Sequence, residues 1–267
     1  MTDFYFDQQQ YRLRIGYFDE ITPTLPSLSA IHRAQHLSIP FENFDICLGK
    51  GINLSSDHLF NKLIKQKRGG YCFELNGILL LALQSFDFSA RALLGRVHLS
   101  GKPTGRGHQI TLVSFGEEKY IVDAGFGSNT PPMPIPLVCN SEFSFQDQSF
   151  KLVNTALFGY MLQTKYENGW KDLYSFELNH VCEGDIAYGN HYTSTSPDSL
   201  FTKSRVAVIR KENGIITLLN RRIRKALNGK EEIIFLEENQ SYISALKEHF
   251  GIELNTQYEQ LKPYHPE

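Results

Sequence analysis

This chain is organised around the stretch Arg68-Gly-Gly-Tyr-Cys-Phe-Glu-Leu-Asn-Gly-Ile-Leu-Leu-Leu-Ala-Leu-Gln-Ser85. The Gly-Gly pair interrupts the preceding pattern, and the leucines and isoleucine beyond it recur at the spacing of one helical face. This predicts a buried helix that begins near Cys72. A helix N-terminus carries free amides and a partial positive charge, which favour a thiolate over a thiol. Cys72 is therefore a candidate nucleophile, and the alternative is an inert buried cysteine.

Residues on the N-terminal side of this stretch carry helical signals from about residue 22. One helix is expected after a cap at Ser27 or Ser29, and another over residues 55–65. Beyond it the hydrophobic period changes to two, which predicts strands at residues 90–98, 109–115, 119–122, 160–166 and 170–177. Residues 131–136, Pro-Pro-Met-Pro-Ile-Pro, are expected to form an extended surface connection.

The C-terminal part mixes both patterns. Residues 205–211 and 215–220 flank Glu212-Asn-Gly214 and predict a hairpin, and a final helix is expected over residues 239–250. The chain thus reads as mainly α, then mainly β, then mixed. No internal repeat or flexible linker separates these regions.

Composition sets limits on the class of protein. The 267 residues are 41% hydrophobic and 21% charged, which is ordinary for a globular protein and excludes a disordered or fibrous chain. A net charge of -2 provides no field for a nucleic acid. The longest apolar run, residues 78–83, is too short to span a membrane, and no secretory signal is seen, so we expect a cytoplasmic protein.

Four cysteines, Cys47, Cys72, Cys139 and Cys182, lack the paired spacing of a zinc or redox site. Free thiols in a reducing compartment are expected, and no metal.

A cysteine nucleophile needs a base, and the base needs an orienting group. The strands at 109–115 and 119–122 should form one hairpin, with His108 and Asp123 near its open end. Alternation places both side chains on the buried face. Four other histidines, His32, His36, His58 and His191, are expected to be surface or core residues.

Two further segments leave alternatives open. Gly125-Phe-Gly-Ser128 follows Asp123 closely and suits either an anion-binding nest of backbone amides or an ordinary glycine turn. The basic run Arg221-Arg-Ile-Arg-Lys225 suits the phosphates of a cofactor or, with more weight, a solvated strand edge or loop, and it is not assigned to the site.

Five motifs follow one another along roughly the first three quarters of the chain: Ile39-Pro-Phe-Glu-Asn-Phe-Asp45, Arg68-Gly-Gly-Tyr-Cys-Phe-Glu-Leu-Asn76, Gly107-His108, Asp123-Ala-Gly-Phe-Gly127 and Asn190-His-Tyr-Thr-Ser-Thr-Ser-Pro197. In this order they resemble the motifs of the arylamine N-acetyltransferase family. The motif around Cys72 is the most specific of them, and residues after about 203 carry the least distinctive pattern.

The resemblance implies an α+β fold with a thiol-protease-like triad of Cys72, His108 and Asp123. It implies a helical bundle at residues 1–88, a β-barrel at 89–196 and a small α/β lid at 197–267. The implied activity is transfer of an acetyl group from acetyl-coenzyme A to an aromatic amine or hydrazine, through an acetyl-cysteine in a ping-pong cycle. The partners implied are these small molecules alone, in a monomer or homodimer.

The same resemblance implies an acceptor pocket and a cofactor loop. Phe41, Val97, Phe126 and Phe201 match positions that line the acceptor pocket, while Gly125, Phe126 and Gly127 match the loop near coenzyme A. For each aromatic residue the alternative is simple core packing.

Three other functions share these sequence features. A thiol hydrolase or transglutaminase-like enzyme uses the same triad in the same chain order, with water in place of the amine for hydrolysis. An amide synthase that closes a natural-product chain is a related alternative. A non-catalytic binding module that keeps the fold is the alternative from outside enzymes.

Overall fold

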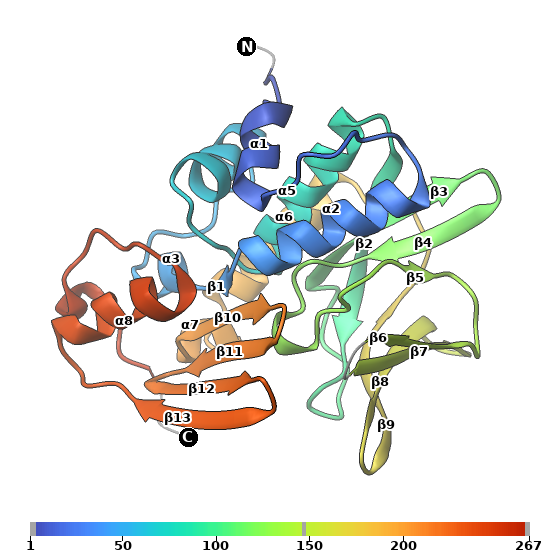
Figure 1. The fold of residues 1–267 in the computed structure, drawn as a ribbon. Helices are drawn as coiled ribbons and strands as arrows, with labels where there is room; N and C mark the ends of the chain where they lie inside the picture. The colour runs from blue at the N-terminus through green and yellow to red at the C-terminus, as the bar shows by residue number, and fades with distance from the viewer. Residues whose placement is uncertain (1–3, 146–147, 265–267) are drawn as a thin grey trace.

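The computed structural model describes residues 4–145 and 148–264 of the chain. Its elements form a helical group, a large curved sheet and a smaller sheet with its own helix, which lie at the top, right and lower left of Figure 1. The predicted α+β fold is confirmed. The division at residues 88/89 and 196/197 stays a prediction.

The helical group surrounds one buried helix. Its elements are α1 (Gln8–Ile15), α2 (Leu25–Ser38), α3 (Phe44–Cys47), α4 (Ser56–Phe60), the π-helical turn η1 (Asn61–Lys65) and α5 (Cys72–Ser85). The predicted start of a helix at Cys72 is confirmed, and α5 is buried on several faces because α1, α2 and α4 pack around it. The predicted cap at Ser27 or Ser29 is wrong, since α2 begins at Leu25 with Pro26 in its first turn, where its missing N–H costs nothing.

The large sheet is antiparallel throughout and curves into a nearly closed barrel. Its strands are β2 (Ser89–Val97), β3 (His108–Phe115), β4 (Glu118–Val122), β5 (Ile135–Pro136), β6 (Glu142–Phe145), β7 (Gln148–Thr155), β8 (Gly159–Tyr166) and β9 (Gly169–Phe176), in the order β5-β4-β3-β2-β9-β8-β7-β6. Every strand predicted in this region is present, with ends displaced by at most one residue. Apolar side chains such as Ile110, Phe150 and Leu173 fill its interior.

The proline-rich segment differs from its prediction. Pro131, Pro132 and Pro134 are buried, so the segment is not a surface connection. Its last two residues form β5, which pairs only with β4 and therefore lies at the edge of the sheet. An edge strand tolerates proline because one side of its backbone needs no ladder hydrogen bond.

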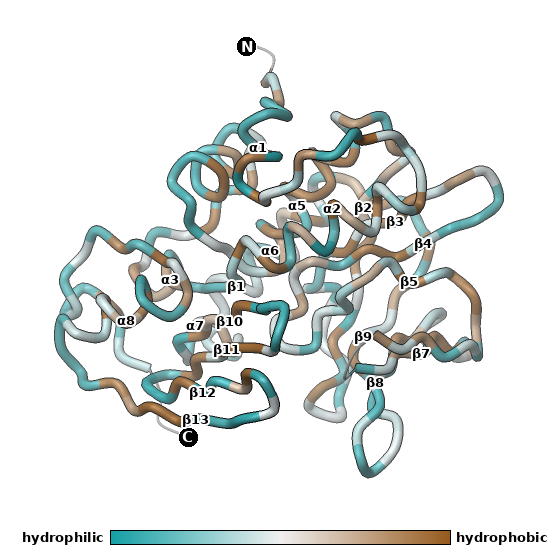
Figure 2. Tube along the Cα trace, viewed as in Figure 1, coloured by the Kyte–Doolittle hydropathy of each residue, from teal (hydrophilic) through white to brown (hydrophobic). Residues whose placement is uncertain are grey.

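One strand of the smaller sheet comes from the N-terminal part of the chain, far from the other four in sequence. Its C-terminal strands are β10 (Val206–Lys211), β11 (Gly214–Leu219), β12 (Arg222–Leu227) and β13 (Lys230–Phe235), and β1 (Phe41–Glu42) pairs antiparallel with β10. The predicted hairpin is confirmed by the β10–β11 pairing. Figure 2 shows hydrophobic residues along β10 and β11 and hydrophilic ones at the turn between them. One face of this sheet packs on α8 (Gln240–Phe250), which confirms the predicted final helix.

Four helical elements, most of them short, complete the description of the fold. They are η2 (Gly127–Asn129), α6 (Glu183–Thr195) and α7 (Leu200–Lys203), followed near the C-terminus by η3 (Tyr258–Gln260). The helix α6 was not predicted, and it lies in the region expected to be barrel.

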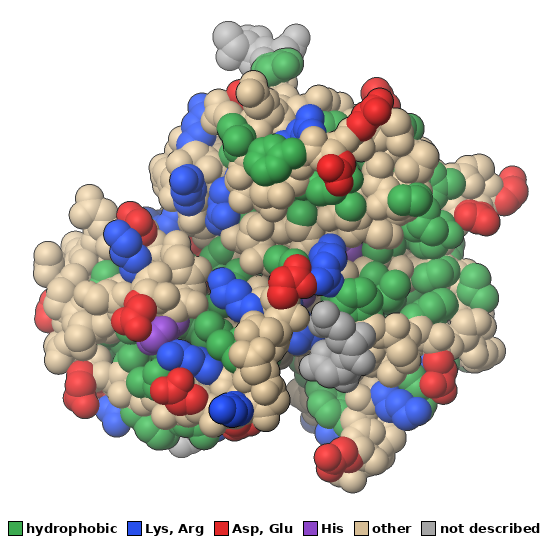
Figure 3. All heavy atoms as spheres, in the orientation of Figure 1, with side chains coloured by type: hydrophobic (Ala, Val, Ile, Leu, Met, Phe, Trp, Pro, Cys, Tyr) green, Lys and Arg blue, Asp and Glu red, His purple; other side chains and the backbone are tan. Residues whose placement is uncertain are grey.

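Residues 222–225 of the basic run belong to an inner strand, so the expected strand edge is wrong, although Arg221 lies in an exposed turn. β12 lies between β11 and β13, and Arg224 and Lys225 form ion pairs with Glu231 and Glu232 of β13. Positive and negative side chains are interspersed in this way over the face drawn in Figure 3. Within residues 4–145 and 148–264, no helix has the length and apolar character needed to cross a membrane.

Candidate active site

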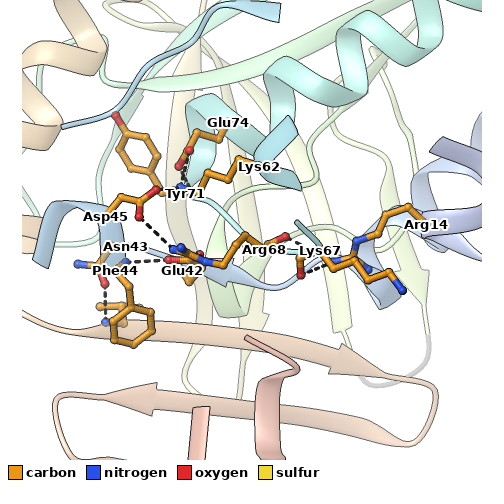
Figure 4. A network of polar contacts seen from close by, with 11 residues as sticks. Arg14, Glu42, Asn43, Phe44, Asp45, Lys62, Lys67, Arg68, Tyr71 and Glu74 are labelled. Atoms are coloured by element: carbon orange, nitrogen blue, oxygen red, sulfur yellow. Dashed lines mark hydrogen bonds and ion pairs between the residues drawn. The ribbon is translucent and has the colours of Figure 1, made fainter. Parts of the chain in front are cut away.

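The N-terminus of α5 is held by a buried network of ion pairs, drawn in Figure 4. Lys62 Nζ lies 2.7 Å from Glu74 Oε1 and 2.6 Å from Asp45 Oδ2, and Arg68 Nη2 lies 2.7 Å from Glu42 Oε1. The second carboxylate oxygen of Glu74 accepts from the backbone N–H of residue 71 at 3.1 Å, which caps the first turn of the helix. The network therefore fixes the position at which Cys72 enters the helix.

Glycine at residue 69 permits the approach of β1 to this turn. A Cβ on Gly69 would collide with the backbone oxygen of Pro40 and approach Glu42 Cγ to 2.8 Å. The backbone of Glu42 donates to the oxygen of Gly70 at 2.9 Å. The Gly-Gly pair predicted to precede α5 is thus also the place where β1 contacts the turn before that helix.

Cys72 is the first residue of α5, and only 4% of its surface is exposed. Its Sγ lies 3.8 Å from the backbone oxygen of Gly107, and its side chain acts on that of His108, raising the pKa of the imidazole. Cys72 and His108 both line one pocket, so the thiol lies beside the imidazole at the surface of a cavity.

His108 and Asp123 lie beyond the last paired residues of the β3–β4 hairpin. Nε2 of His108 lies 2.8 Å from Oδ2 of Asp123, and both residues are buried. The rings of Phe126 and Tyr174 lie on His108 with centroid distances of 4.8 Å each. The hairpin brings the pair together as expected, but alternation alone is uninformative, because β3 is buried on both faces.

The other carboxylate oxygen of Asp123 accepts hydrogen bonds from one side-chain donor and one backbone donor. Asn76 Nδ2 donates to Oδ1 at 2.9 Å and the backbone N–H of Gly125 donates to it at 2.8 Å. The amide of Gly125 is therefore engaged with Asp123, which removes one donor from the anion-binding nest that was one of two alternatives for this segment. Gly125 also approaches α5 closely, since a Cβ there would lie 2.9 Å from Cys72 Cα.

The electrostatics favour an ionised pair. Burial by itself lowers the pKa of His108, but the charge and hydrogen bond of Asp123, with a smaller contribution from Cys72, raise it to about 10. Burial would raise the pKa of Asp123, yet His108, Asn76 and the amide of Gly125 outweigh this and lower it. At neutral pH the imidazole carries a proton and the carboxylate does not.

The pocket in front of Cys72 has a volume of about 860 Å³. Of the residues predicted for the site, only Asp123 does not line the pocket, because it lies behind His108. The others line it: Phe41, Cys72, Val97, His108, Gly125, Phe126, Gly127 and Phe201. Phe41 comes from β1, and its ring lies 5.8 Å from that of Phe201, centroid to centroid. Three separate parts of the chain thus form one cavity.

Sequence reasoning missed a side of this pocket and two residues behind it. His180, Asp185, Tyr188, Tyr192 and Thr193, on or next to α6, line the pocket. Tyr192 and Thr193 lie in the motif at residues 190–197, so a signal was present, but the helix that carries them was not predicted. Asn76 and Tyr174 contact Asp123 and His108 from inside the core. Asn76 ends the motif at residues 68–76, so a signal was present for it too, whereas nothing local in the sequence marks Tyr174.

Among the described residues, no group of three or more His, Cys, Asp or Glu side chains is arranged to hold a metal ion. The described cysteines are all free thiols.

Comparisons with known proteins agree with this geometry. Residues 24–258 match the family model described as N-acetyltransferase. The chain is 32% identical over 247 residues to the arylamine N-acetyltransferase of Escherichia coli K12, covering 91% of this chain and 87% of that protein.

Solved structures give the same result. The arylamine N-acetyltransferase from Salmonella typhimurium superposes with a TM-score of 0.90 at 29% identity, covering 95% of each chain. The Mycobacterium marinum arylamine N-acetyltransferase in complex with CoA superposes with a TM-score of 0.88 at 29% identity, covering 96% of this chain and 97% of that one. This chain therefore belongs to the arylamine N-acetyltransferase family.

Proposed function

We propose that this enzyme transfers the acetyl group of acetyl-coenzyme A to an aromatic amine or hydrazine by way of an acetyl-cysteine at Cys72. The observation that carries the proposal is that Cys72 and His108 line one pocket, with Nε2 of His108 held 2.8 Å from Oδ2 of Asp123 behind it. Relatives named arylamine N-acetyltransferase, and one solved with CoA, support the donor and the acceptor.

In the first half-reaction the Cys72 thiolate attacks the thioester carbonyl of acetyl-coenzyme A. The S–C bond to Cys72 forms, and the tetrahedral intermediate collapses by breaking the bond to the coenzyme A sulfur. Protonated His108 gives its proton to that leaving thiolate, so free coenzyme A departs as a thiol. His108 suits this role because its pKa is raised to about 10, which keeps it protonated at neutral pH.

In the second half-reaction the amine nitrogen attacks the acetyl carbonyl on Cys72. His108, now neutral, accepts the proton that the amine loses, and the bond to the Cys72 sulfur breaks. The products are the N-acetylated amine and the original thiolate–imidazolium pair. Asp123 keeps the Nε2–H of His108 in place and stabilises its positive charge in both halves.

The oxyanion of each tetrahedral intermediate needs a hydrogen-bond donor. The backbone N–H of Cys72 is the donor we propose, because it lies in the first turn of α5, where backbone amides have no partner within the helix.

The pocket supports an aromatic acceptor. Phe41, Val97, Phe126 and Phe201 line it, and such surfaces match a flat ring. Aromatic amines also have low basicity, so their nitrogen is neutral and nucleophilic near pH 7. Gly125 to Gly127 lie beside Cys72 on the same pocket, where the pantetheine end of coenzyme A would have to pass.

We also propose a cytoplasmic protein that acts on foreign arylamines, as a monomer or homodimer, with no nucleic acid or membrane partner. The free thiols and the mixed surface charge support this.

Intact-protein mass spectrometry after mixing with acetyl-coenzyme A tests the proposal. One acetyl group should appear on the wild type and on C182S, which lacks an exposed thiol, and none should appear on C72A. Adding an arylamine should then remove the acetyl group and yield the N-acetyl product. A wild type that stays unacetylated, or that turns over acetyl-coenzyme A at a rate indifferent to the amine, would overturn it, and the second result would indicate a hydrolase.

A further inference from the structure

A histidine outside the Cys72–His108–Asp123 series contacts the middle of the proposed machinery. His32, on the buried side of α2, has no exposed surface, and its Nε2 lies 2.8 Å from the backbone oxygen of Asp123. This oxygen belongs to the same residue whose carboxylate holds His108. A hydrogen bond here therefore fixes the peptide from which that carboxylate extends.

The surroundings of His32 determine which of its nitrogens carries the proton. A carbonyl oxygen only accepts, so Nε2 is the donor. Nδ1 is buried and has no hydrogen-bond partner among the described residues. A proton on Nδ1 would have no acceptor there, and the resulting buried charge would be costly. His32 is thus a neutral Nε2–H tautomer, consistent with burial lowering its pKa against the opposing effect of Asp123.

The helix that carries His32 is itself held against the helix of the nucleophile. Gln35, one turn further along α2, donates from Nε2 to the backbone oxygen of Leu75 at 2.9 Å and accepts from the hydroxyl of Tyr11 at 2.7 Å. Leu75 lies in the first turns of α5, which begins at Cys72. The helix α2 therefore links the element that holds Cys72 to the residue that orients His108.

We propose that His32 is a positioning residue of the acetyl transfer, which keeps the Asp123 carboxylate aimed at His108 by donating to the Asp123 carbonyl. The inference rests on the proposed function of Cys72, His108 and Asp123. The titratable and charged groups that act on this region are His36 and Arg33 of α2, Arg210 of β10 and Asp123 itself.

Three substitutions separate positioning from simple core packing. His32→Phe keeps a ring of similar size and removes the donor. His32→Gln restores an amide N–H close to the position of Nε2. His36→Phe is the matched control, because His36 is one turn away on the same helix, its ring nitrogen Nε2 is also buried without a partner among the described residues, and it makes no described contact with Asp123 beyond a weak electrostatic one.

The experiment measures, for each variant, the rate of Cys72 acetylation by acetyl-coenzyme A, the KM for acetyl-coenzyme A, and the rate of Cys72 alkylation by iodoacetamide against pH. H32F should acetylate about tenfold more slowly, the equivalent of one lost buried hydrogen bond, at unchanged KM. In the plot of the H32F alkylation rate against pH, the change at alkaline pH that reports loss of the His108 proton should move to lower pH. The reason is that a less well aimed Asp123 carboxylate stabilises the protonated imidazole less. H32Q should recover most of the rate, and H36F should match wild type in rate and pH profile even where its Tm falls.

Two results would overturn the proposal: an H32F enzyme with wild-type rate and pH profile, or equal losses in H32F and H36F. The failure of the proposed function is recognised separately, since wild-type protein would then form no acetyl-cysteine or would turn over acetyl-coenzyme A at a rate indifferent to the amine. The alkylation profile reports on Cys72 and His108 without any acetyl donor, so it tests His32 in either case.

Discussion

Asn76 joins the helix of the nucleophile to the carboxylate behind His108: its Nδ2 donates to Asp123 Oδ1 over 2.9 Å, and its Oδ1 accepts from the backbone N–H of Ala124 over 2.8 Å. Because the side chain spans two elements, its loss should let the carboxylate turn away from the imidazole. We expect Asn76→Ala to slow Cys72 acetylation by about tenfold without changing the KM for the amine. Stopped-flow acetylation measures this, with Gln84→Ala on the exposed end of the same helix as the control. An unchanged rate in N76A would contradict the role of Asn76.

Removing the charge of Asp123 should have a larger effect. In Asp123→Asn the burial that lowers the pKa of His108 is no longer opposed by a carboxylate, so the imidazole loses its proton at neutral pH. We expect a fall in kcat on the order of 10⁴-fold, as for other triads whose carboxylate becomes an amide. Steady-state assays with an arylamine measure kcat, and a far-UV spectrum like that of the wild type excludes misfolding. A mild loss in D123N would rule out the proposed electrostatic role.

The triad also makes stability depend on pH. His108 has its pKa raised from 6.5 to about 10, so its contribution is fully present below pH 6.5 and is lost as the pH rises through about 10. Asp123 has a lowered pKa, so its contribution is present above 3.8 and is lost as the pH falls through the lowered value. The difference in free energy of unfolding between wild type and D123N should therefore shrink between pH 6.5 and 10. Urea unfolding at a series of pH values measures it, and a constant difference would contradict the assignment of a protonated His108.

Breaking the ion-pair network should unfold the region around α5 more readily. Lys62→Met leaves Glu74 buried without its cation and leaves Asp45 with Arg68 alone, which we expect to cost about 3–5 kcal/mol of unfolding free energy. Lys247→Met removes an exposed pair with Glu253 and should cost at most about 1 kcal/mol. Urea denaturation compares the two, and equal small losses would show that the network contributes little to stability.

Gly125 is expected to tolerate no side chain. A Cβ there would lie 2.9 Å from Cys72 Cα and 3.0 Å from Asn76 Nδ2, so Gly125→Ala must displace the loop that follows Asp123. We expect kcat to fall by about 10²-fold, because a shift of an ångström in a reacting group has that order of effect. Gly184→Ala is the control, since a Cβ at that helical position makes only ordinary contact with Cys182 Sγ at 3.6 Å. Activity retained in G125A would mean that the loop adapts.

The core of the site was predictable because its signals are local. A hairpin fixes the relation of His108 to Asp123 within a few residues, and a Gly-Gly break before an apolar run fixes the start of the Cys72 helix. The alternation of apolar and polar residues located the barrel strands β2, β3, β4, β8 and β9, whereas β5, β6 and β7 were not predicted. These features depend on short-range backbone geometry, which sequence spacing reports directly.

The rest depends on partners that lie far away in the chain. The helix α6 carries two glycines and several β-branched or turn-favouring residues, so its own propensity for helix is poor and packing must stabilise it. The basic run of β12 resembled an exposed edge because the acidic residues that pair with it lie on β13. Buried contacts of Asn76, Tyr174 and His32 join separate elements, and a single sequence does not show which elements meet.

The pairing of β1 with β10 makes the N-terminal helical part of the chain depend on the C-terminal sheet for its structure. The strand β1 consists of Phe41 and Glu42, which pair with Val208 and Ala207 of β10. Phe41 lines the pocket, and Glu42 forms an ion pair with Arg68. A chain shortened before β10 would lose that backbone support at the substrate cavity and at the ion-pair network together. Nascent protein emerging from the ribosome therefore cannot complete its catalytic pocket until β10 has been synthesised.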